Sequence, residues 1–180
     1  MTPADSHRDS RPAAWPRATA CGLSLREAMP TDTDFLAQVY ADTRREELAV
    51  VPWTEDQKAA FLRHQFELQD AYYRQHYFGA AFFVIEAAGM GLGRLYLHRQ
   101  PAELRLMDIA LLHPWRGQGR GTALILDVVE HADRLGLPLS LHVEEHNPVQ
   151  SLYARLGFQF KEDRGVYQFL MRPVDAGMVD

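Results

Sequence analysis

A loop with glycine at alternate positions is the feature of this sequence that most constrains its fold. The loop contains Gly117, Gly119 and Gly121, and it joins an apolar run over residues 109–112 to a helix-like segment from Thr122. A buried strand that leads through such a loop into a helix directs backbone N–H groups and the positive end of the helix dipole at one place. Alternate glycines let a ligand lie against bare backbone. The segment therefore predicts a site for a pyrophosphate group, and hence for a phosphorylated cofactor.

Length and composition indicate one globular domain. The chain has 180 residues, 47% of them hydrophobic and 24% charged, which is enough for a sizeable core. Its net charge of −5 argues against a nucleic-acid partner. Cys21 is the only cysteine, so an intramolecular disulfide and a cysteine-rich metal site are excluded, and we expect no metal. No apolar run approaches the length of a membrane span, so we expect no membrane association and a cytoplasmic location.

The expected organisation is a disordered tail over residues 1–18, one domain over residues 19–174 and a short tail over residues 175–180. The first segment lacks an apolar signal-peptide core and is rich in Pro, Ala, Asp and Arg. Within the domain, hydrophobic periodicity predicts the order strand, two helices, three strands, helix, strand, helix and strand. The strands are expected near residues 21–25, 82–85, 94–97, 104–112, 139–143 and 166–171, and the helices near residues 35–40, 54–77, 122–135 and 148–156. A capping box from Thr54 to Gln57 is expected to begin the second helix, and Gly136 is expected to end the third.

This order predicts an α/β (α+β) fold. The strand–helix–strand unit in the middle of the chain implies a parallel pair with a right-handed crossover. The three strands before it are typical of an antiparallel meander. We therefore expect a mixed, mostly antiparallel sheet with helices on both faces.

Two motifs identify a family when they are taken together. Residues 116–121 fit the pattern Gln/Arg-x-x-Gly-x-Gly/Ala after a strand, and residues 152–158 read Leu-Tyr-x-x-Leu-Gly-Phe. In this order they resemble the GNAT superfamily of acyl-CoA-dependent N-acetyltransferases, over residues 23–172 in element order and most specifically over residues 109–158. The resemblance implies a sheet whose central parallel strands splay apart, with acetyl-CoA as the cofactor. The rival dinucleotide pattern Gly-x-Gly-x-x-Gly does not fit, because the glycines here alternate.

The resemblance also implies where the cofactor lies. Its pyrophosphate is expected on the N–H groups from Gln118 to Thr122, and its pantetheine arm beside the preceding strand. The expected cofactor-binding residues are Ile109, Ala110, Leu111, Arg116, Gly117, Gln118, Gly119, Arg120, Gly121, Thr122 and Asn147. The sequence departs from the family pattern in two places. His113 stands where the family has proline, with Pro114 one residue later, and Asn147 lies six residues before the motif tyrosine instead of seven.

Three residues are candidates for catalysis. The resemblance places Tyr153 near the cofactor sulfur, where a phenol can protonate a departing thiolate. His142 and Asp108 are candidate bases, since an alkylammonium must lose a proton before it attacks. Structural roles remain open for all three: packing for Tyr153, a position beside the sheet for His142 and a salt bridge to Arg94 for Asp108. A water chain is a further alternative, because proximity alone contributes about 7–11 kcal/mol.

The first two helices and their connection cover the acceptor in the family. The second helix carries glutamines within an otherwise apolar stripe, and buried glutamines need partners. We therefore expect the substrate-binding residues Arg44, Glu47, Trp53, Gln57 and Gln65. A half-exposed helix with polar flanks is the alternative interpretation.

These features predict an enzyme that transfers an acetyl group from acetyl-CoA to a primary amine of a small molecule, peptide or protein. We expect direct attack in a ternary complex, because Cys21 lies in the first expected strand and no nucleophile is placed for an acyl-enzyme. The alternative is a non-catalytic acyl-CoA-binding sensor. A homodimer is possible, and the acceptor, acyl length and base stay open.

Overall fold

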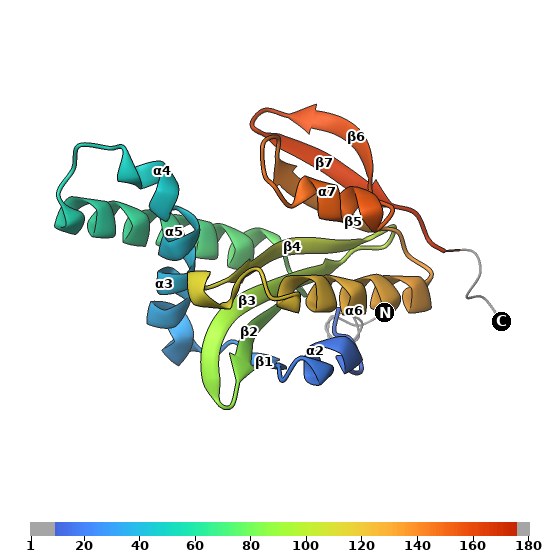
Figure 1. Cartoon of the computed structure of the whole chain (residues 1–180). Helices are drawn as coiled ribbons and strands as arrows, with labels where there is room; N and C mark the ends of the chain where they lie inside the picture. Colours follow the sequence, from blue (N-terminus) through green and yellow to red (C-terminus); the bar gives the residue numbers. More distant parts are fainter. Residues whose placement is uncertain (1–9, 176–180) are drawn as a thin grey trace.

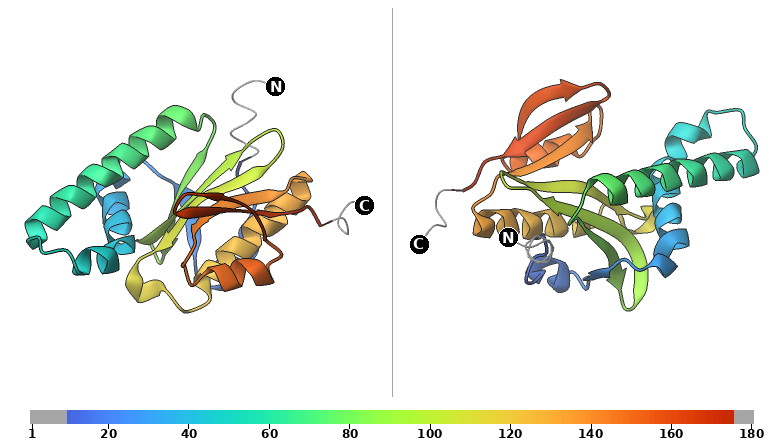
Figure 2. Two further views of the ribbon diagram at one scale, coloured as in Figure 1. Left: turned by 90° about the horizontal axis from the view of Figure 1, so that it is seen from above. Right: turned by 180° about the vertical axis from the view of Figure 1, so that it is seen from behind.

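The computed structural model describes residues 10–175, which form a seven-stranded sheet with helices on both faces (Figures 1 and 2). The elements in chain order are α2 (Pro16–Ala20), β1 (Ser24–Glu27), η1 (Pro30–Asp32), α3 (Thr33–Thr43), α4 (Arg45–Ala49), α5 (Glu55–His76), β2 (Ala81–Ala87), β3 (Met90–Arg99), β4 (Leu104–Leu111), η2 (His113–Trp115), α6 (Arg120–Leu135), β5 (Leu139–Glu144), α7 (Gln150–Arg155), β6 (Gln159–Arg164) and β7 (Tyr167–Arg172).

The sheet confirms the predicted fold class. Its strand order is β1-β2-β3-β4-β5-β7-β6, and β4–β5 is the parallel pair among antiparallel neighbours. That pair is short, because only residues 104–106 of β4 are matched with residues 139–141 of β5. The register of β4 on β3 shifts at this point and leaves Met107 as an extra residue. A bulge bends its strand, and beyond it β5, β7 and β6 tilt away from β1–β4 (Figure 1).

Helices α3 and α5 cover one face of the sheet, and α6 covers the other (Figure 2). The first face buries Leu36 of α3, Phe66 of α5 and Val84 of β2 in one apolar cluster. The larger cluster on the opposite face includes Leu95 of β3 and Leu124 of α6. Burial of each such side chain contributes about 1.5–3 kcal/mol. The two clusters therefore hold the helices on a rigid central sheet.

Glycine is required at position 93, where β3 pairs with residues 110 and 111 in the part of β4 that follows the bulge. A Cβ atom at Gly93 would lie 2.3 Å from the carbonyl oxygen of Ala110 and 2.8 Å from Cδ2 of Leu111. Real Cβ atoms do not approach backbone oxygens so closely, so β4 would have to shift. Gly93 thereby helps to fix the part of β4 that runs beside the opening.

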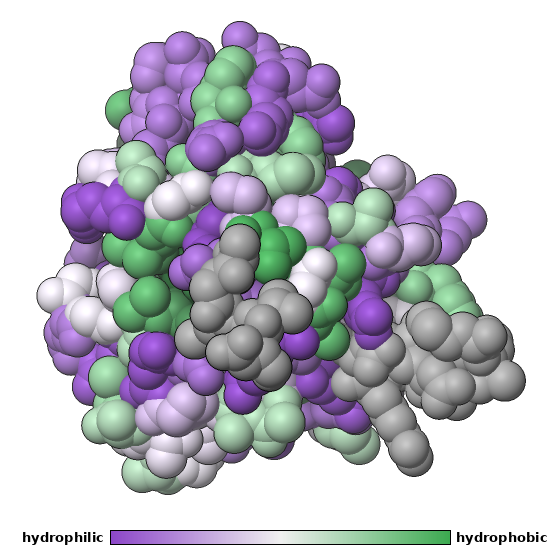
Figure 3. All heavy atoms as spheres, turned by 90° about the vertical axis from the view of Figure 1, so that its right-hand side faces the viewer, coloured by the Kyte–Doolittle hydropathy of each residue, from purple (hydrophilic) through white to green (hydrophobic). Residues whose placement is uncertain are grey.

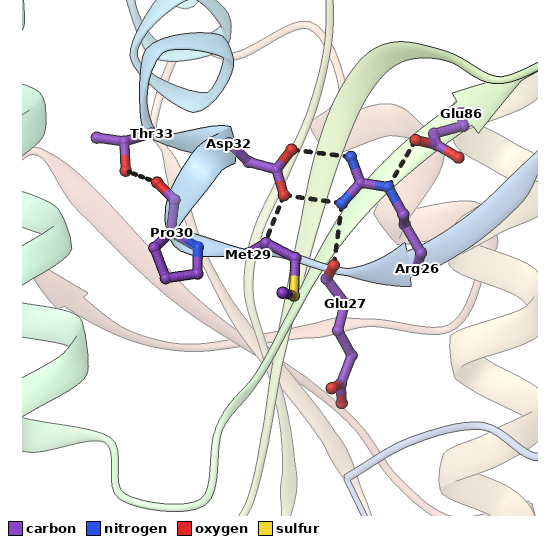
Figure 4. A network of polar contacts seen from close by, with 7 residues as sticks. All are labelled: Arg26, Glu27, Met29, Pro30, Asp32, Thr33 and Glu86. Carbon is purple, nitrogen blue, oxygen red and sulfur yellow. Dashed lines mark hydrogen bonds and ion pairs between the residues drawn. The ribbon is translucent and has the colours of Figure 1, made fainter.

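A network of charged side chains anchors the start of α3 (Figure 4). The guanidinium of Arg26 on β1 donates to both carboxylate oxygens of Asp32, at 2.7 and 2.8 Å, and to Glu86 of β2 at 2.7 Å. The Met29 N–H donates to the same Asp32 carboxylate at 2.6 Å. Hydrogen bonds from Arg26, opposed by desolvation, lower the pKa of Asp32 from 3.8 to about 2. The network fixes where α3 leaves the sheet.

The N-terminal segment differs from expectation. Residues 10–18 were expected to be disordered, yet Ser10 and Ala18 are buried and α2 begins at Pro16. The buried carboxylate of Asp127 on α6 accepts the backbone N–H groups of Arg17 and Ala18, at 3.1 and 2.9 Å. Because this cap lies about 110 residues away in sequence, no local pattern predicts it. The other parts of the expected tails, residues 1–9 and 176–180, lie outside the described residues.

Two further elements were missed, α4 and β6. The first strand also begins later than expected, at Ser24, because Cys21 caps α2. Every residue of β6 is exposed, so the strand lacks the alternation that marks a half-buried strand. Figure 3 shows hydrophilic side chains over the upper part of this side of the molecule, where the β6–β7 hairpin lies. Among residues 10–175, no helix is both long and apolar enough to cross a membrane.

Candidate functional site

The opening between β4 and β5 forms a cavity of about 870 Å³. Its walls come from residues 107–111 of β4, the glycine loop, α7 and residues of α3 and α5 on the opposite side. Residues 108–111 pair with β3 on one edge, and residues 107–111 have no strand partner on the β5 edge. Unpaired backbone groups there need hydrogen-bond partners. An extended ligand in the cavity is able to supply them as an added strand does.

The glycine loop forms one end of the cavity. Gly117 and Gly119 have φ of +71° and +77°, a conformation that disfavours other residues, and Gly119 is the N-cap of the 16-residue helix α6. No side chain caps this helix, and its first turn carries no acidic residue. None of the backbone N–H groups of residues 117–122 donates to another described residue. A Cβ atom at Gly121 would meet nothing within 4 Å. The loop therefore fits an anionic group such as a pyrophosphate.

The two arginines of the loop are held by neighbouring groups. Arg116 donates from Nε to the carbonyl of Leu111 at 2.6 Å and from Nη2 to the carboxylate of Asp42 at 2.8 Å. Arg120 lies over the ring of Trp115, 5.0 Å from its centre, and contacts Gln118. Arg116 is therefore paired with a carboxylate, whereas Arg120 stacks on an aromatic ring.

Asn147 lines the cavity from the turn before α7. Its side-chain oxygen accepts the N–H of Val149 at 3.0 Å, and its backbone carbonyl accepts the N–H of Gln150 at 3.1 Å. The carboxamide oxygen is therefore used to form the turn, and the amide nitrogen remains for a ligand.

Tyr153 of α7 lies in the cavity wall. The residue is 5% exposed and packs edge-to-face on Phe158 at 5.3 Å, and its hydroxyl forms no hydrogen bond to another described residue. Burial, with the nearby charge of Asp108, raises the pKa of Tyr153 to about 12. The phenol is therefore protonated at neutral pH and is suited to donate a proton.

Asp108 lies in the same cavity, and the salt bridge anticipated as an alternative role is present. Nη2 of the buried Arg94 is 2.6 Å from the Asp108 carboxylate and 3.1 Å from Oε1 of Gln69. Burial, followed by the charge of Asp108, raises the pKa of Tyr73. Asp108 and Tyr73 both line the main cavity.

His142 lines the cavity from β5 but is exposed. Its Nε2 is 3.2 Å from Nη1 of Arg164, and its ring packs on Phe169 at 5.0 Å. Desolvation and then the charges of Arg105 and Arg164 lower the pKa of His142. Since a guanidinium only donates, Nε2 must be the accepting nitrogen, so its lone pair is already engaged.

The expected acceptor residues separate into two groups. Arg44 and Glu47 line the main cavity and also, with Gln65, a second cavity of about 500 Å³. Trp53 and Gln57 line neither. The indole of Trp53 packs edge-on against Phe61 at 5.3 Å, whereas the Gln57 side chain accepts the Thr54 N–H at 2.9 Å in the predicted capping box at the start of α5.

Arg44 joins the two sides of the main cavity. From the end of α3 it contacts Glu47 at 2.8 Å and Glu144 of β5 at 3.0 Å. Glu144 carries no sequence signal of its own, and neither does Tyr167 of β7, which lines both cavities. Sequence reasoning missed both residues, because β5 and β7 follow α3 by about a hundred residues or more in the sequence and meet it only in the fold.

Several solved structures share this fold. The PaiA N-acetyltransferase of Thermoplasma acidophilum, in complex with coenzyme A, superposes with a TM-score of 0.64 at 18% identity, covering 84% of this chain and 98% of that one. The histone acetyltransferase HPA2 and related acetyltransferase of Corynebacterium glutamicum superposes with a TM-score of 0.63 at 20% identity, covering 88% of this chain and 99% of that one. The ribosomal-protein-S18-alanine N-acetyltransferase of Escherichia coli superposes with a TM-score of 0.59 at 20% identity, covering 87% of this chain and 97% of that one. No curated protein matches the chain.

The identities are low, so these structures establish the fold alone. Family membership comes from the sequence, because the sequence model of the Acetyltransferase (GNAT) family matches residues 36–158, more than half of the chain. The matched segment contains the glycine loop, the bent part of β4 and the Leu-Tyr motif of α7. The chain therefore belongs to the GNAT family of acetyltransferases.

Proposed function

We propose that this protein transfers an acetyl group from acetyl-CoA to a primary amine by direct attack of the amine on the thioester. The observation that carries the proposal is the row of unpaired N–H groups over residues 117–122, continuous with the unpaired edge of β4. Residues 117–122 would hold the pyrophosphate, and residues 109–111 would pair with the pantetheine arm. Acetyl-CoA, when bound, supplies the reactive thioester. The neighbouring CoA complex of the Thermoplasma acidophilum enzyme supports this cofactor class.

Tyr153 is the proton donor in this proposal. When the amine nitrogen bonds to the acetyl carbon, the C–S bond breaks and the thiolate takes a proton from the phenol, and the proton that the nitrogen then releases returns through water to the phenolate. The pKa of Tyr153, raised to about 12, keeps the proton on the phenol until negative charge develops at the sulfur. The buried position of Tyr153 also keeps water away from the thioester.

Asp108 receives the amine. Its carboxylate accepts from Arg94 through one oxygen, at 2.6 Å, and lines the cavity near Tyr153. A second carboxylate oxygen is left to bind an ammonium group and orient it toward the thioester. The amine proton then leaves to water, and most of the rate enhancement comes from proximity, which contributes about 7–11 kcal/mol. We favour Asp108 over His142 because the His142 lone pair faces Arg164.

The second cavity indicates an acceptor with an apolar group beside its amine. It shares Tyr40, Arg44, Glu47, Gln69 and Tyr167 with the main cavity, so the two are adjacent. Its remaining wall is mostly apolar and is formed by Leu48, Phe61, Leu62, Gln65, Leu68 and Tyr72. Apolar side chains left exposed on a cavity wall gain stability when a ligand covers them. A primary amine bearing an aromatic or branched aliphatic group fits this arrangement.

The test is incubation of the full-length protein with acetyl-CoA, a thiol-detecting reagent and a panel of primary amines. Thiol release that requires an amine supports the transferase, and faster release with amines carrying an apolar group supports the acceptor class. Tight CoA binding without release by any amine would favour the acyl-CoA sensor instead. No CoA binding by well-folded protein would refute both.

A further inference from the structure

We propose that Asp42 is a positioning residue for the cofactor loop, and that it acts through the backbone N–H of His113. This inference rests on the proposed function, since it concerns how the loop is prepared for CoA. Asp42 lies on α3, about seventy residues before the loop, and no motif of the family resemblance includes it. Its side chain is only 7% exposed.

One carboxylate oxygen of Asp42 holds the loop at two points. Oδ2 accepts the N–H of His113 at 2.7 Å and Nη2 of Arg116 at 2.8 Å. Arg116 in turn donates to the carbonyl of Leu111 at 2.6 Å. The carboxylate therefore ties the end of β4, the turn η2 and the first residue of the glycine segment into one unit. Charge-assisted hydrogen bonds of this kind are short and strong.

The same contact explains why histidine replaces the proline that the family pattern has at position 113. Proline has no N–H, so a proline there is unable to donate to Asp42. The backbone does not itself exclude proline, because Leu112 has φ −57° and ψ +144°, the extended conformation that precedes proline readily. Position 113 is also the first residue of η2, where proline is tolerated. The distinguishing property of His113 in this structure is therefore its donor.

Asp42 also links the two halves of the site. Tyr40 and Thr43, its neighbours on α3, line the main cavity, and Arg44 reaches Glu144 across it. A single helix thus carries acceptor-side residues and the carboxylate that holds the cofactor loop. In this arrangement the loop is ordered before CoA arrives, so less conformational entropy is lost on binding.

The test compares CoA affinity and acetyl-CoA kinetics among matched variants. We expect Asp42→Ala to weaken CoA binding about tenfold, since the loop loses the charged acceptor that holds it at His113 and Arg116. KM for acetyl-CoA should rise by a similar factor, with little change in kcat at saturation. His113→Pro should bind CoA about tenfold more weakly than His113→Ala, which keeps the N–H. Asp34→Ala, on the same helix with an exposed partner in Arg63, should bind like the parent protein.

A double-mutant cycle separates positioning from general destabilisation. Once Asp42 is replaced by Ala, the further change His113→Pro should have little additional effect on CoA affinity, because its acceptor is gone. Unchanged affinity in Asp42→Ala, or fully additive losses in the double variant, would overturn the inference. If Asp42→Ala does not fold, Asp42→Asn and the two His113 variants carry the same test. Failure of the parent protein to bind CoA would refute the proposed function instead, so the two failures are distinguishable.

Discussion

One end of the main cavity is formed mainly by backbone groups, and the other end mainly by side chains. The cofactor end is formed chiefly by backbone: the N–H groups of residues 117–122 and the unpaired edge of residues 107–111. The acceptor end is formed by side chains from α3, α4, α5 and β7. Backbone geometry follows from glycine and helix positions that are close in sequence, whereas a side-chain wall depends on contacts between distant segments. The first end can therefore stay constant across a family while the second changes with the substrate.

The charges of the two ends differ in the same way. At the end proposed for the cofactor, Arg116 is paired with Asp42 and Arg120 lies over Trp115, beside N–H groups of a helix whose first turn has no acidic residue. At the end proposed for the acceptor, charges occur as pairs across the cavity, such as Arg94 with Asp108 at 2.6 Å and Arg44 with Glu144 at 3.0 Å. The uncapped N–H groups and the helix N-terminus favour an anion, whereas paired charges orient a ligand without selecting strongly by its charge.

The largest expected effect is at the junction of the two ends. Tyr153→Phe removes the proton donor and should lower kcat by about a hundredfold to ten-thousandfold, the range typical of general acid–base catalysis. CoA affinity should stay near that of the parent protein, because the loop is untouched. Steady-state kinetics and calorimetry measure the two quantities.

Tyr96→Phe is the matched control for that variant. Tyr96 is also buried, its pKa is also raised to about 12 by burial, and it does not line the cavity. An equal loss of kcat in both variants would show that the effect comes from packing and not from proton donation.

A second prediction concerns the acid sensitivity that a buried histidine of α6, the helix that follows the glycine loop, confers on the domain. His131 of α6 is buried, and burial followed by the charges of Arg134 and Arg99 lowers its pKa from 6.5 to about 4. Between pH 6.5 and pH 4 the unfolded chain binds the proton and the folded chain does not, so stability falls as the pH falls. The full depression corresponds to up to about 3 kcal/mol. Denaturant unfolding at several pH values should show a smaller loss in His131→Gln.

His64→Gln provides the comparison on the acceptor side, because His64 is an exposed residue of α5. The free energy of unfolding of the His64→Gln variant should depend on pH as that of the parent protein does. If His131→Gln instead keeps the full acid sensitivity, the buried histidine of α6 is not its source.

The third prediction concerns the backbone end alone. Gly119→Ala places a Cβ on a residue with φ of +77° at the N-cap of α6. The loop must rotate to relieve this strain, which misdirects two or more N–H groups and should weaken CoA binding about a hundredfold. Gly89→Ala carries the same strain, at φ of +76° in the β2–β3 turn, away from the cavity. Calorimetry that finds equal affinity in both variants would contradict the role of the loop.

The difference between local backbone geometry and contacts of distant side chains also explains which features the sequence was able to predict. The glycine loop, the capping box at Thr54 and the helix stop at Gly136 depend on neighbours within a few residues, and all three are found in the structure. The parallel pair and the mostly antiparallel sheet also followed from element order. Contacts over about a hundred residues, such as the Asp127 cap on α2, have no local signal.

The acceptor wall shows the same limit at the site itself. Helical periodicity placed Gln57 and Gln65 on one face of α5, yet only Gln65 lines a cavity. Arg44, Glu47 and Trp53 were selected because the family resemblance implies that the first two helices and their connection cover the acceptor, and of these Trp53 lines neither cavity. Periodicity says which side a residue faces, and it does not say whether the facing partner is another side chain or a cavity.

The smallest expected effect is at the acceptor wall. Leu68 of α5 is 53% exposed and lines the second cavity. Leu68→Asp should lower kcat/KM about tenfold for a primary amine with an aromatic group, since covering a leucine side chain contributes about 1.5–3 kcal/mol. A short alkylamine should be affected little, and CoA affinity should not change. Val50→Asp is the control, because Val50 is 86% exposed yet lines neither cavity. Equal losses for both amines in Leu68→Asp would mean that the second cavity does not hold the acceptor, and the side-chain end of the site would then be limited to the main cavity.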